Sequence, residues 1–247
     1  MHLHLPRNRR GQPVRTPVIA RIAWAMCLLP AFSSAASAQL NTSLTLSSDV
    51  RFRGQSITGD HAAATADLGY DSPSGLYLAA NTTIALVEGD VEPANVQANI
   101  GFARRLRSGP TIDLGVLRSD YREYYGGRDR AHFTEAYAGV LTNHFAFYLR
   151  YSPDFLRPGL QTLYGEINAT TEVAPRWHLS AHVGAQARLA GPRIGAASGV
   201  DWKLAVARET GPVELQLAVT GRSDTAGYRE RWEHVSPGVI VSVTWRP

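Results

Sequence analysis

The sequence predicts an all-β protein, a single up-and-down antiparallel transmembrane β-barrel of about 12 strands. Three observations predict this fold. Apolar and polar residues alternate along many segments, most of these segments are about 8 to 13 residues long, and the connections between them are alternately long and short. Strands of soluble proteins are typically shorter, about 5 or 6 residues. After the N-terminal region no stretch approaches 18 consecutive apolar residues, so no transmembrane helix is expected.

Residues 1–38 have the features of a secretory signal peptide. Five arginines precede the apolar stretch "IAWAMCLLPAF", and "ASA" comes directly before Gln39, which predicts cleavage after Ala38. The apolar stretch is interrupted by Pro30 and is shorter than the ~20 residues of a membrane-spanning helix, which disfavours an anchor. We therefore expect residues 39–247 to form one mature domain.

Removal of the leader changes both the charge and the chemistry of the chain. The leader holds five of the 25 basic residues and none of the 21 acidic ones, so 20 basic and 21 acidic residues remain. This balance removes any argument for nucleic-acid binding from basicity. Cys27 is the only cysteine, so the mature chain can form no disulfide or zinc-thiolate site. A lipid-modified Cys27 is disfavoured because Trp24 stands where such signals usually carry Leu, and Arg9-Arg10 leaves twin-arginine export open.

The alternation is already present in the first segment, which includes the stretch "SSDVRFRGQS" (residues 47–56). One face of a strand would carry an aspartate and two arginines, and the other would carry Val, Phe and Gly. We place this stretch at the end of the first strand, with Gly54 opening the first external loop. Residues 177–189, "WHLSAHVGAQARL", alternate along their whole length in the same way. The segments begin near residues 40, 62, 76, 96, 111, 133, 145, 162, 177, 200, 213 and 238.

The connections between these segments fall into two sets. The long set is "GQSITGDH", "ALVEGDVEPA", "RSDYREYYGGRDRA", "SPDFLRPGLQ", "AGPRIGAASG" and "RSDTAGYRERWEHVSP". The short set is "DSPSG", "RSGP", "NH", "APR" and "ETGP". Outer-membrane barrels have short periplasmic turns and long external loops, so this alternation predicts that both ends of the barrel chain lie on the periplasmic side.

The alternation also assigns each face of the strands. In a bilayer every backbone polar group must be paired, so the strands must close into a barrel, with apolar side chains toward lipid and polar ones toward the lumen. Arg51 and Arg53 are expected to pair there with carboxylates, for which Asp67 and Asp113 are candidates. The residues expected to line the lumen or a constriction are Asp49, Arg51, Arg53, Asp67, Arg105, Asp113, Glu166, His178, His182, Arg188, Lys203, Glu214 and Arg222.

Two features of the expected lipid face are distinctive. Aromatic residues near strand ends are candidates for interfacial girdles, although strands favour aromatics anyway. They are Phe52, Tyr70, Phe102, Phe133, Phe145, Trp177, Trp202 and Trp245. The second and third segments are only weakly apolar on this face, and a subunit contact or a protein-covered patch would explain that. The small residues there are Ala62, Ala64, Ala66, Ala80 and Thr82.

The N-terminal part of the mature chain resembles a proteobacterial family labelled Gcw_chp or TorF-type, whose members are inferred to be outer-membrane porins. Ser48, Asp49, Phe52, Arg53, Gly54 and Ser56 match its motif S-D-Y-x-F-R-G-x-S, with Val50 in place of Tyr, and Gly75, Leu76 and Tyr77 match a second motif. The resemblance extends over nearly the whole mature chain, but its specific motifs are confined to residues 48–83. It implies an outer-membrane barrel and supplies no catalytic residues.

These observations predict a porin of the outer membrane that passes small hydrophilic solutes or ions. A lipid-modifying enzyme, a receptor, a purely structural barrel and a soluble ligand-binding barrel are the alternatives. We expect no cofactor, no metal, no enzymatic activity and no nucleic-acid partner. The expected partners are outer-membrane lipid, lipopolysaccharide, the barrel-assembly machinery during biogenesis and small solutes, and a homo-oligomer is left open.

One group of residues is a conceivable hydrolase site. His178, Ser180 and His182 point to one side of one strand, and Glu166 lies on the strand before it. A lining of lumen-facing polar residues is the favoured reading, because a lipid hydrolase must present its nucleophile to lipid. The two histidines are roughly 13 Å apart on a strand, too far to share a metal ion. The loop 120–130 could fold inward as a constriction, but a solvated loop is favoured.

Overall fold

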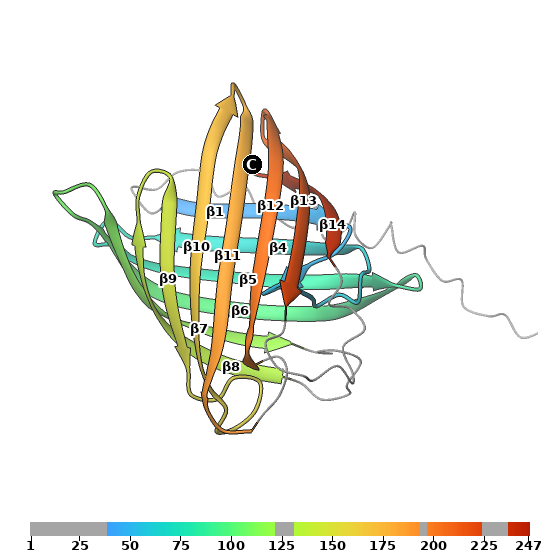
Figure 1. Cartoon of the computed structure of the whole chain (residues 1–247). Helices are drawn as coiled ribbons and strands as arrows, with labels where there is room; N and C mark the ends of the chain where they lie inside the picture. Colours follow the sequence, from blue (N-terminus) through green and yellow to red (C-terminus); the bar gives the residue numbers. More distant parts are fainter. Residues whose placement is uncertain (1–38, 122–130, 193–196, 224–236) are drawn as a thin grey trace, which may run out of the picture. The chain divides into compact units, whose positions relative to one another are not determined.

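The computed structural model describes residues 39–121, 131–192, 197–223 and 237–247. Twelve antiparallel strands close into one barrel, in which the first strand pairs with the last (Figure 1). The barrel strands are β1 (Gln39–Ser47), β4 (Ala63–Asp71), β5 (Leu76–Val87), β6 (Asp90–Arg105), β7 (Thr111–Tyr121), β8 (Ala131–Leu141), β9 (Phe145–Ser152), β10 (Gln161–Ala174), β11 (Trp177–Ala190), β12 (Gly199–Thr210), β13 (Val213–Ser223) and β14 (Gly238–Trp245). The predicted fold class and strand number are confirmed. Within the described residues no helix is long and apolar enough to cross a membrane.

The connections divide the barrel into two ends. At one end, the turn end, the strands are joined by residues 72–75, 106–110, 142–144, 175–176 and 211–212. At the other, the loop end, they are joined by residues 48–62, 88–89, 122–130, 153–160, 191–198 and 224–237. The predicted sorting of short and long connections therefore holds at ten of the eleven positions, and the exception is the second connection at the loop end.

The expected long connection "ALVEGDVEPA" is wrong. β5 and β6 continue through it and are joined by Glu88-Gly89 alone, with φ angles of 49° and 89°. Two consecutive residues with positive φ form the hairpin turn that matches the twist of the strands. Pro93 suggested a loop, but it lies next to a register shift at Thr83/Ile84, where a bulge tolerates a residue without an N–H.

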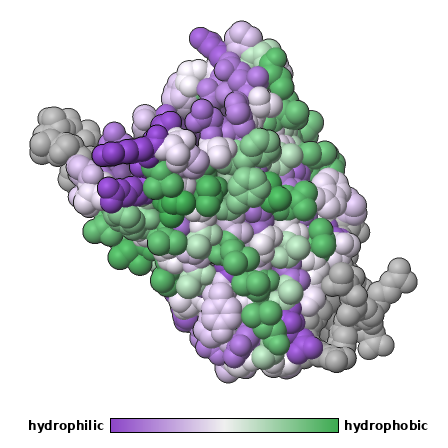
Figure 2. Space-filling model, turned by 60° about the vertical axis from the view of Figure 1, so that its left-hand side comes forward, coloured by the Kyte–Doolittle hydropathy of each residue, from purple (hydrophilic) through white to green (hydrophobic). Residues whose placement is uncertain are grey.

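The outside of the barrel is apolar, as predicted. Figure 2 shows apolar side chains gathered in a band across the outer face, with hydrophilic side chains near an end. The large apolar residues on this surface come from all around the barrel and include Leu46, Leu68, Leu78, Ile100, Leu114, Leu149, Ile167, Val183, Leu204, Leu217 and Val241. An apolar surface of this extent is unstable in water and matches the lipid-facing band of a membrane barrel.

Two of the aromatic residues expected at the lipid face lie inside the barrel instead. Phe133 is 1% exposed and belongs to a cluster at the loop end together with Tyr121, Ala131, Phe155, Leu160 and Ala197. Phe52 packs against this cluster, with its ring 5.4 Å from Tyr121 and 5.9 Å from Phe133. The prediction failed because an aromatic residue that fills a barrel interior has the same alternation as one that faces lipid.

On the inner face, tyrosine side chains cover glycines of neighbouring strands. A Cβ atom added to any of these glycines would come within 1.9–2.4 Å of the ring or hydroxyl of the tyrosine that covers it. Since glycine has no side chain, each ring can rest against the barrel wall rather than project into the lumen. The pairs are Tyr77 over Gly101, Tyr137 over Gly115, Tyr148 over Gly139 and Tyr164 over Gly184.

Candidate functional site

The stretch after β1 forms a hairpin inside the barrel rather than the end of a strand. β1 ends at Ser47, and residues 48–62 contain the two short strands β2 (Arg51–Phe52) and β3 (Gln55–Ser56), which pair only with each other. We call residues 48–60 the inner hairpin. The expectation that this stretch ends the first strand is therefore wrong, because the alternation in "DVRFRG" belongs to a separate small hairpin.

Hydrogen bonds to one carboxylate hold the inner hairpin together. Asp49 accepts from the Arg51 Nε at 2.6 Å, from the Ser56 hydroxyl at 2.6 Å and from the Thr58 hydroxyl at 2.8 Å. The Arg51 guanidinium also reaches Asp60 at 3.0 Å. Bonds between charged partners are short and strong, so the hairpin is a defined structure rather than a slack loop.

Arg53, at the tip of the inner hairpin, anchors it to the opposite wall. Its guanidinium forms an ion pair with Glu135 of β8 at 2.7 Å and a hydrogen bond with Gln186 of β11 at 3.0 Å. It also lies 3.9 Å from the ring centroid of Tyr164 on β10. Arg53 is 8% exposed and Glu135 is 1% exposed. Removing one partner of a buried ion pair leaves an uncompensated charge, which makes this contact hard to break singly.

The tip also depends on close contact with the barrel wall. Arg53 and Gly54 have φ angles of 49° and 75°, the left-handed conformation of a two-residue hairpin turn. A Cβ atom on Gly54 would lie 2.8 Å from both the Cβ of Arg222 and the carbonyl oxygen of Gly221. The Arg222 guanidinium donates in turn to the Arg53 carbonyl at 3.2 Å. Only glycine fits at this position.

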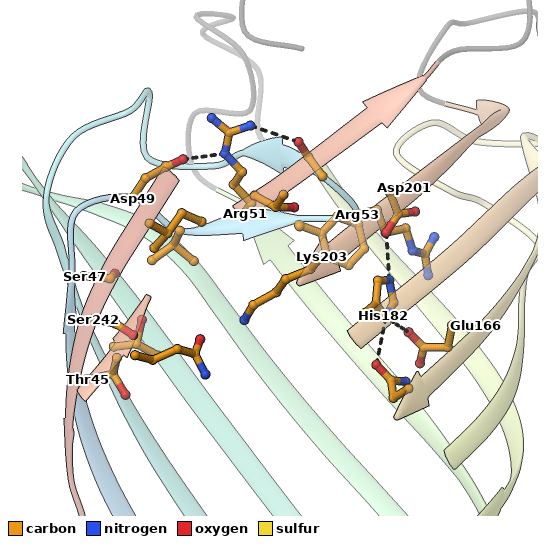
Figure 3. A pocket seen from close by; sticks show the side chains of 18 of the residues that line it. Thr45, Ser47, Asp49, Arg51, Arg53, Glu166, His182, Asp201, Lys203 and Ser242 are labelled. Atoms are coloured by element: carbon orange, nitrogen blue, oxygen red, sulfur yellow. Dashed lines mark hydrogen bonds and ion pairs between the residues drawn. The ribbon is translucent and has the colours of Figure 1, made fainter. Parts of the chain in front are cut away.

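A cavity of about 570 Å³ lies against the inner hairpin (Figure 3). Hairpin residues Asp49 to Gly54 contribute to its lining, together with side chains from strands on both sides of the barrel. A second cavity of about 470 Å³ shares the lining residues Gln97, Leu117 and Arg150 with the first and extends to Asn41 and Arg246 near the turn end. The lumen is therefore hollow between the inner hairpin and the turn end.

The two sides of this lumen differ chemically. The side made by β13, β14, β1, β4, β5 and β6 is mostly neutral, and its cavity-lining residues include Gln216, Ser242, Thr244, Ser43, Thr45, Thr65, Asn81, Gln97 and Asn99. Two carboxylates interrupt it, namely Asp67, which accepts from Ser43 at 2.9 Å, and Glu214, which pairs with Arg246 at 3.3 Å. The side made by β8 to β12 carries Glu135, Arg150, Glu166, His182, Asp201 and Lys203.

The charged side is a connected network of partners. Arg150 pairs with Glu166 at 2.8 Å, and the His182 ring contacts Asp201 at 2.9 Å and Asn168 at 2.8 Å. Figure 3 shows His182 between Asp201 and Glu166. Networks of this kind fix side-chain positions, because each member is held by more than one bond.

Lys203 of β12 differs from the other charged residues. Figure 3 shows its side chain extending into the cavity, on the side facing Ser242 and Thr45. With the described residues its ammonium group makes no hydrogen bond or ion pair, and Glu214 is the carboxylate that acts on it electrostatically. It is also the only lysine among the 247 residues, whose other basic residues are all arginine.

The structure brings some of the residues expected in the lumen together and separates others. Eight of them line the two cavities: Asp49, Arg51, Arg53, Glu166, His182, Lys203 and Glu214 the first, and Asp67 the second. The other five do not line either cavity. Arg105 is exposed at the turn end, His178 lies 3.5 Å from Glu209, Arg188 donates to the Gly191 carbonyl, Arg222 contacts the inner hairpin, and Asp113 is held by tyrosines.

The expected ion-pair partners of the arginines are wrong. Neither Asp67 nor Asp113 pairs with Arg51 or Arg53, because the inner hairpin carries both arginines away from the wall where those aspartates lie. Glu135 is not among the predicted lumen residues, because it shares a strand face with Phe133, an aromatic residue predicted to face lipid. A carboxylate in the middle of a strand with one lipid-facing side was the available signal, since it cannot face hydrocarbon. Asp201 lies two residues before Lys203 and could have been found by the same alternation.

The histidines do not form a pair with Ser180 among the residues that the structure places. The His182 ring is bonded to Asn168 and Asp201, and the closest charged neighbour of His178 is Glu209. Ser180 lines a third cavity of about 270 Å³ near the β8–β9 turn. Of the expected loop 120–130, Asp120 and Tyr121 are described and belong to β7, and the rest lies outside the described residues.

Asp113 joins three tyrosines near the turn end. It accepts from the Tyr77 hydroxyl at 2.7 Å and from the Tyr148 hydroxyl at 2.9 Å. The Tyr77 hydroxyl also meets that of Tyr137, which donates to Asn99 at 2.9 Å. These bonds join five neighbouring strands, β5 to β9, and hold the rings against the wall, away from the lumen.

We expect Asp113→Asn to lower the free energy of unfolding of the barrel by about 1–2 kcal/mol, because hydrogen bonds to a charged acceptor are worth more than those to a neutral one. Urea unfolding in lipid vesicles measures this change. Asp67→Asn is the matched control, since Asp67 is half-buried and accepts from Ser43. Equal effects of the two substitutions would contradict a bracing role for Asp113.

Comparison with known proteins places this barrel in a family. The family described as "Bacterial protein of unknown function (Gcw_chp)" matches residues 32–236. The chain belongs to the Gcw_chp family. The resemblance read from the sequence motifs is thereby confirmed, and this Gcw_chp chain is not similar in sequence to any curated protein.

Solved structures show what the Gcw_chp barrel is similar to. The NanC porin matches with a TM-score of 0.56 and 9% identity, over 84% of this chain and 99% of NanC. The KdgM porin matches with a TM-score of 0.52 and 10% identity, over 83% of this chain and 98% of KdgM. At these identities the likeness shows a shared fold, that of outer-membrane porins.

Proposed function

We propose that this protein is a channel of the outer membrane that lets small hydrophilic solutes or ions cross by passive diffusion. The observation that carries the proposal is the hollow, polar lumen, in which cavities of about 570 and 470 Å³ adjoin below the inner hairpin. Twelve strands lie between the eight that side chains can fill and the sixteen that leave a water channel. Because the tyrosine rings pack over glycines against the barrel wall, they occupy less of the lumen, which favours the passage of solutes.

The apolar outer band supports insertion into a bilayer, and the fold shared with NanC and KdgM supports the outer membrane as its location. In this arrangement the turn end faces the periplasm and the loop end faces outward. Lipid and lipopolysaccharide then surround the barrel, the barrel-assembly machinery inserts it, and a homo-oligomer would cover the small residues on β4 and β5. Cleavage of the leader after Ala38 would leave Gln39, the first residue of β1, as the N-terminus.

Reconstitution of the purified protein into planar lipid bilayers tests the proposal. We expect discrete conductance steps from a barrel that also shows heat-modifiable migration in gels, the mark of a folded outer-membrane barrel. A folded but silent barrel would contradict the channel and favour a structural or receptor role. Release of fatty acid from lipid, lost in Ser180→Ala, would favour an enzyme instead. Edman sequencing of the protein from outer-membrane fractions checks that the mature chain begins at Gln39.

A further inference from the structure

The first cavity contains one cationic side chain that forms no ion pair with the described residues. Five carboxylates line the first cavity, and each has a partner: Asp49 with Arg51, Glu135 with Arg53, Glu166 with Arg150, Asp201 with His182 and Glu214 with Arg246. The three arginines that line it are those of the first three pairs. Lys203 is the one cation of this cavity whose side chain makes neither a hydrogen bond nor an ion pair with the described residues, and this side chain extends into the open space.

The chemistry of Lys203 suits a passing ligand rather than a fixed one. Arginine binds carboxylates through two parallel hydrogen bonds and is used wherever this lumen needs a permanent ion pair. An ammonium group is a compact, strongly hydrated point charge on a flexible stem. A channel needs sites that are favourable enough to enter and weak enough to leave, so lysine fits this position better than arginine. The single lysine of a chain with 25 basic residues lies at this position.

The surroundings of Lys203 limit the charge of the ligand. Asp201 lies two residues away on the same face of β12, and Glu214 acts on Lys203 electrostatically. These carboxylates would repel an anion with two or more charges more strongly than a singly charged one. Neutral hydrogen-bonding groups line the same cavity, including the Gln216 amide and the Ser242 hydroxyl. A single carboxylate could therefore contact Lys203 while its polar substituents bond to neutral groups.

We propose that Lys203 is a specificity-determining contact for small organic anions with a single carboxylate, which it binds transiently during passage through the lumen. This inference rests on the proposed channel function and names the solute class for that same lumen. The rest of the lining adds no strong preference of its own, because its other three carboxylates, Asp49, Glu135 and Glu166, are each paired with an arginine.

Reversal potentials in planar bilayers under a potassium lactate gradient test the proposal. We expect Lys203→Met to lower the lactate-to-potassium permeability ratio about fivefold, since one unit charge at contact distance in water is worth about 1 kcal/mol. Lys203→Arg keeps the charge and should retain most of the ratio. Arg157→Met is the matched control, because it removes an exposed positive charge from the loop 153–160 outside the cavities. An unchanged ratio in Lys203→Met would overturn the proposal while leaving the channel itself intact.

Chemical labelling of the wild-type protein in detergent gives a second test that does not need conduction. Lys203 is the only side-chain amine, so peptide mass spectrometry can follow its acetylation by an N-hydroxysuccinimide ester separately from the N-terminal amine. Potassium lactate should slow this acetylation at least about twofold relative to potassium chloride of equal ionic strength, because bound carboxylate shields the amine. Equal rates in the two salts would overturn the inference, even if the barrel proved silent and the channel proposal failed.

Discussion

Replacing Val50–Thr58 of the inner hairpin with a Gly-Gly linker should raise the single-channel conductance about twofold to fivefold, because the narrowest segment limits passage through a pore. These residues cross from the β1 wall to the β8–β13 wall and carry Arg53 into its contacts with Glu135, Gln186 and Tyr164. Planar bilayer recording measures the change, and heat-modifiable migration confirms that the variant is folded. A folded variant with unchanged conductance would show that the inner hairpin does not narrow the conducting path.

A point substitution of Arg53 tests the contact that anchors the inner hairpin while the rest of the hairpin stays in place. Arg53→Ala leaves Glu135, which is 1% exposed, without its ion-pair partner, and losses of this kind cost about 3–5 kcal/mol. If the tip of the inner hairpin leaves the wall, water can reach Glu135 and the cost of the unpaired charge falls. The hairpin should then move between an attached and a detached position, and the single-channel current should fluctuate between a lower and a higher level. Arg157→Ala is the control, since Arg157 lies exposed on another connection at the loop end. Wild-type noise in Arg53→Ala would mean that Asp49 and its partners hold the hairpin without the anchor.

Gly184→Ala should lower the free energy of unfolding of the barrel by about 1–3 kcal/mol, the typical cost of overpacking. The new Cβ would lie 1.9 Å from the Tyr164 hydroxyl, and Tyr164 is 2% exposed, so its ring has little room to move. The ring also lies beneath the Arg53 guanidinium, so its displacement should loosen the inner hairpin as well. Urea unfolding in vesicles measures the stability, and bilayer recording measures the loosening.

Gly69→Ala is the matched control for this prediction. Gly69 also faces inward from a barrel strand, but a Cβ there would lie 3.7 Å from the nearest atom, an ordinary contact. Both substitutions change glycine to alanine in a strand, so the difference between them isolates the clash with the ring. A loss of stability from Gly69→Ala as large as that from Gly184→Ala would refute the role of the tyrosine rings.

The barrel itself could be predicted from the sequence, because its causes are local and repeated. A strand that crosses a bilayer must alternate along its length, so residues such as Val183 and His182 reveal their faces without any knowledge of the partner strands. The tertiary structure determined the length of the β5–β6 connection, for which the local sequence was misleading. Pro93 suggested a loop, but a bulge in the β5–β6 ladder accommodates it.

The candidate site was only partly predictable for a related reason. Alternation assigns a residue to one of two faces, but it does not say whether a strand belongs to the barrel wall or turns inward, as the residues after Ser47 do. It also cannot tell an aromatic residue in the lumen from one in lipid, which is why Phe133 and its neighbour Glu135 were misplaced. Lys203 was placed on the correct face, yet its lack of a side-chain partner among the residues that the structure places depends on where those other charges lie.

The sequence by itself therefore determined the barrel, its strand number and the two faces of most strands, since these follow from the periodic contact of each strand with lipid and water. Only the tertiary structure decided that "SSDVRFRGQS" folds back as a hairpin inside the lumen, because contacts with Glu135, Gln186 and Arg222 on distant strands hold it there. Pairing among residues more than 80 positions apart leaves no periodic trace in a single sequence, and it is this pairing that leaves Lys203 as the available cation.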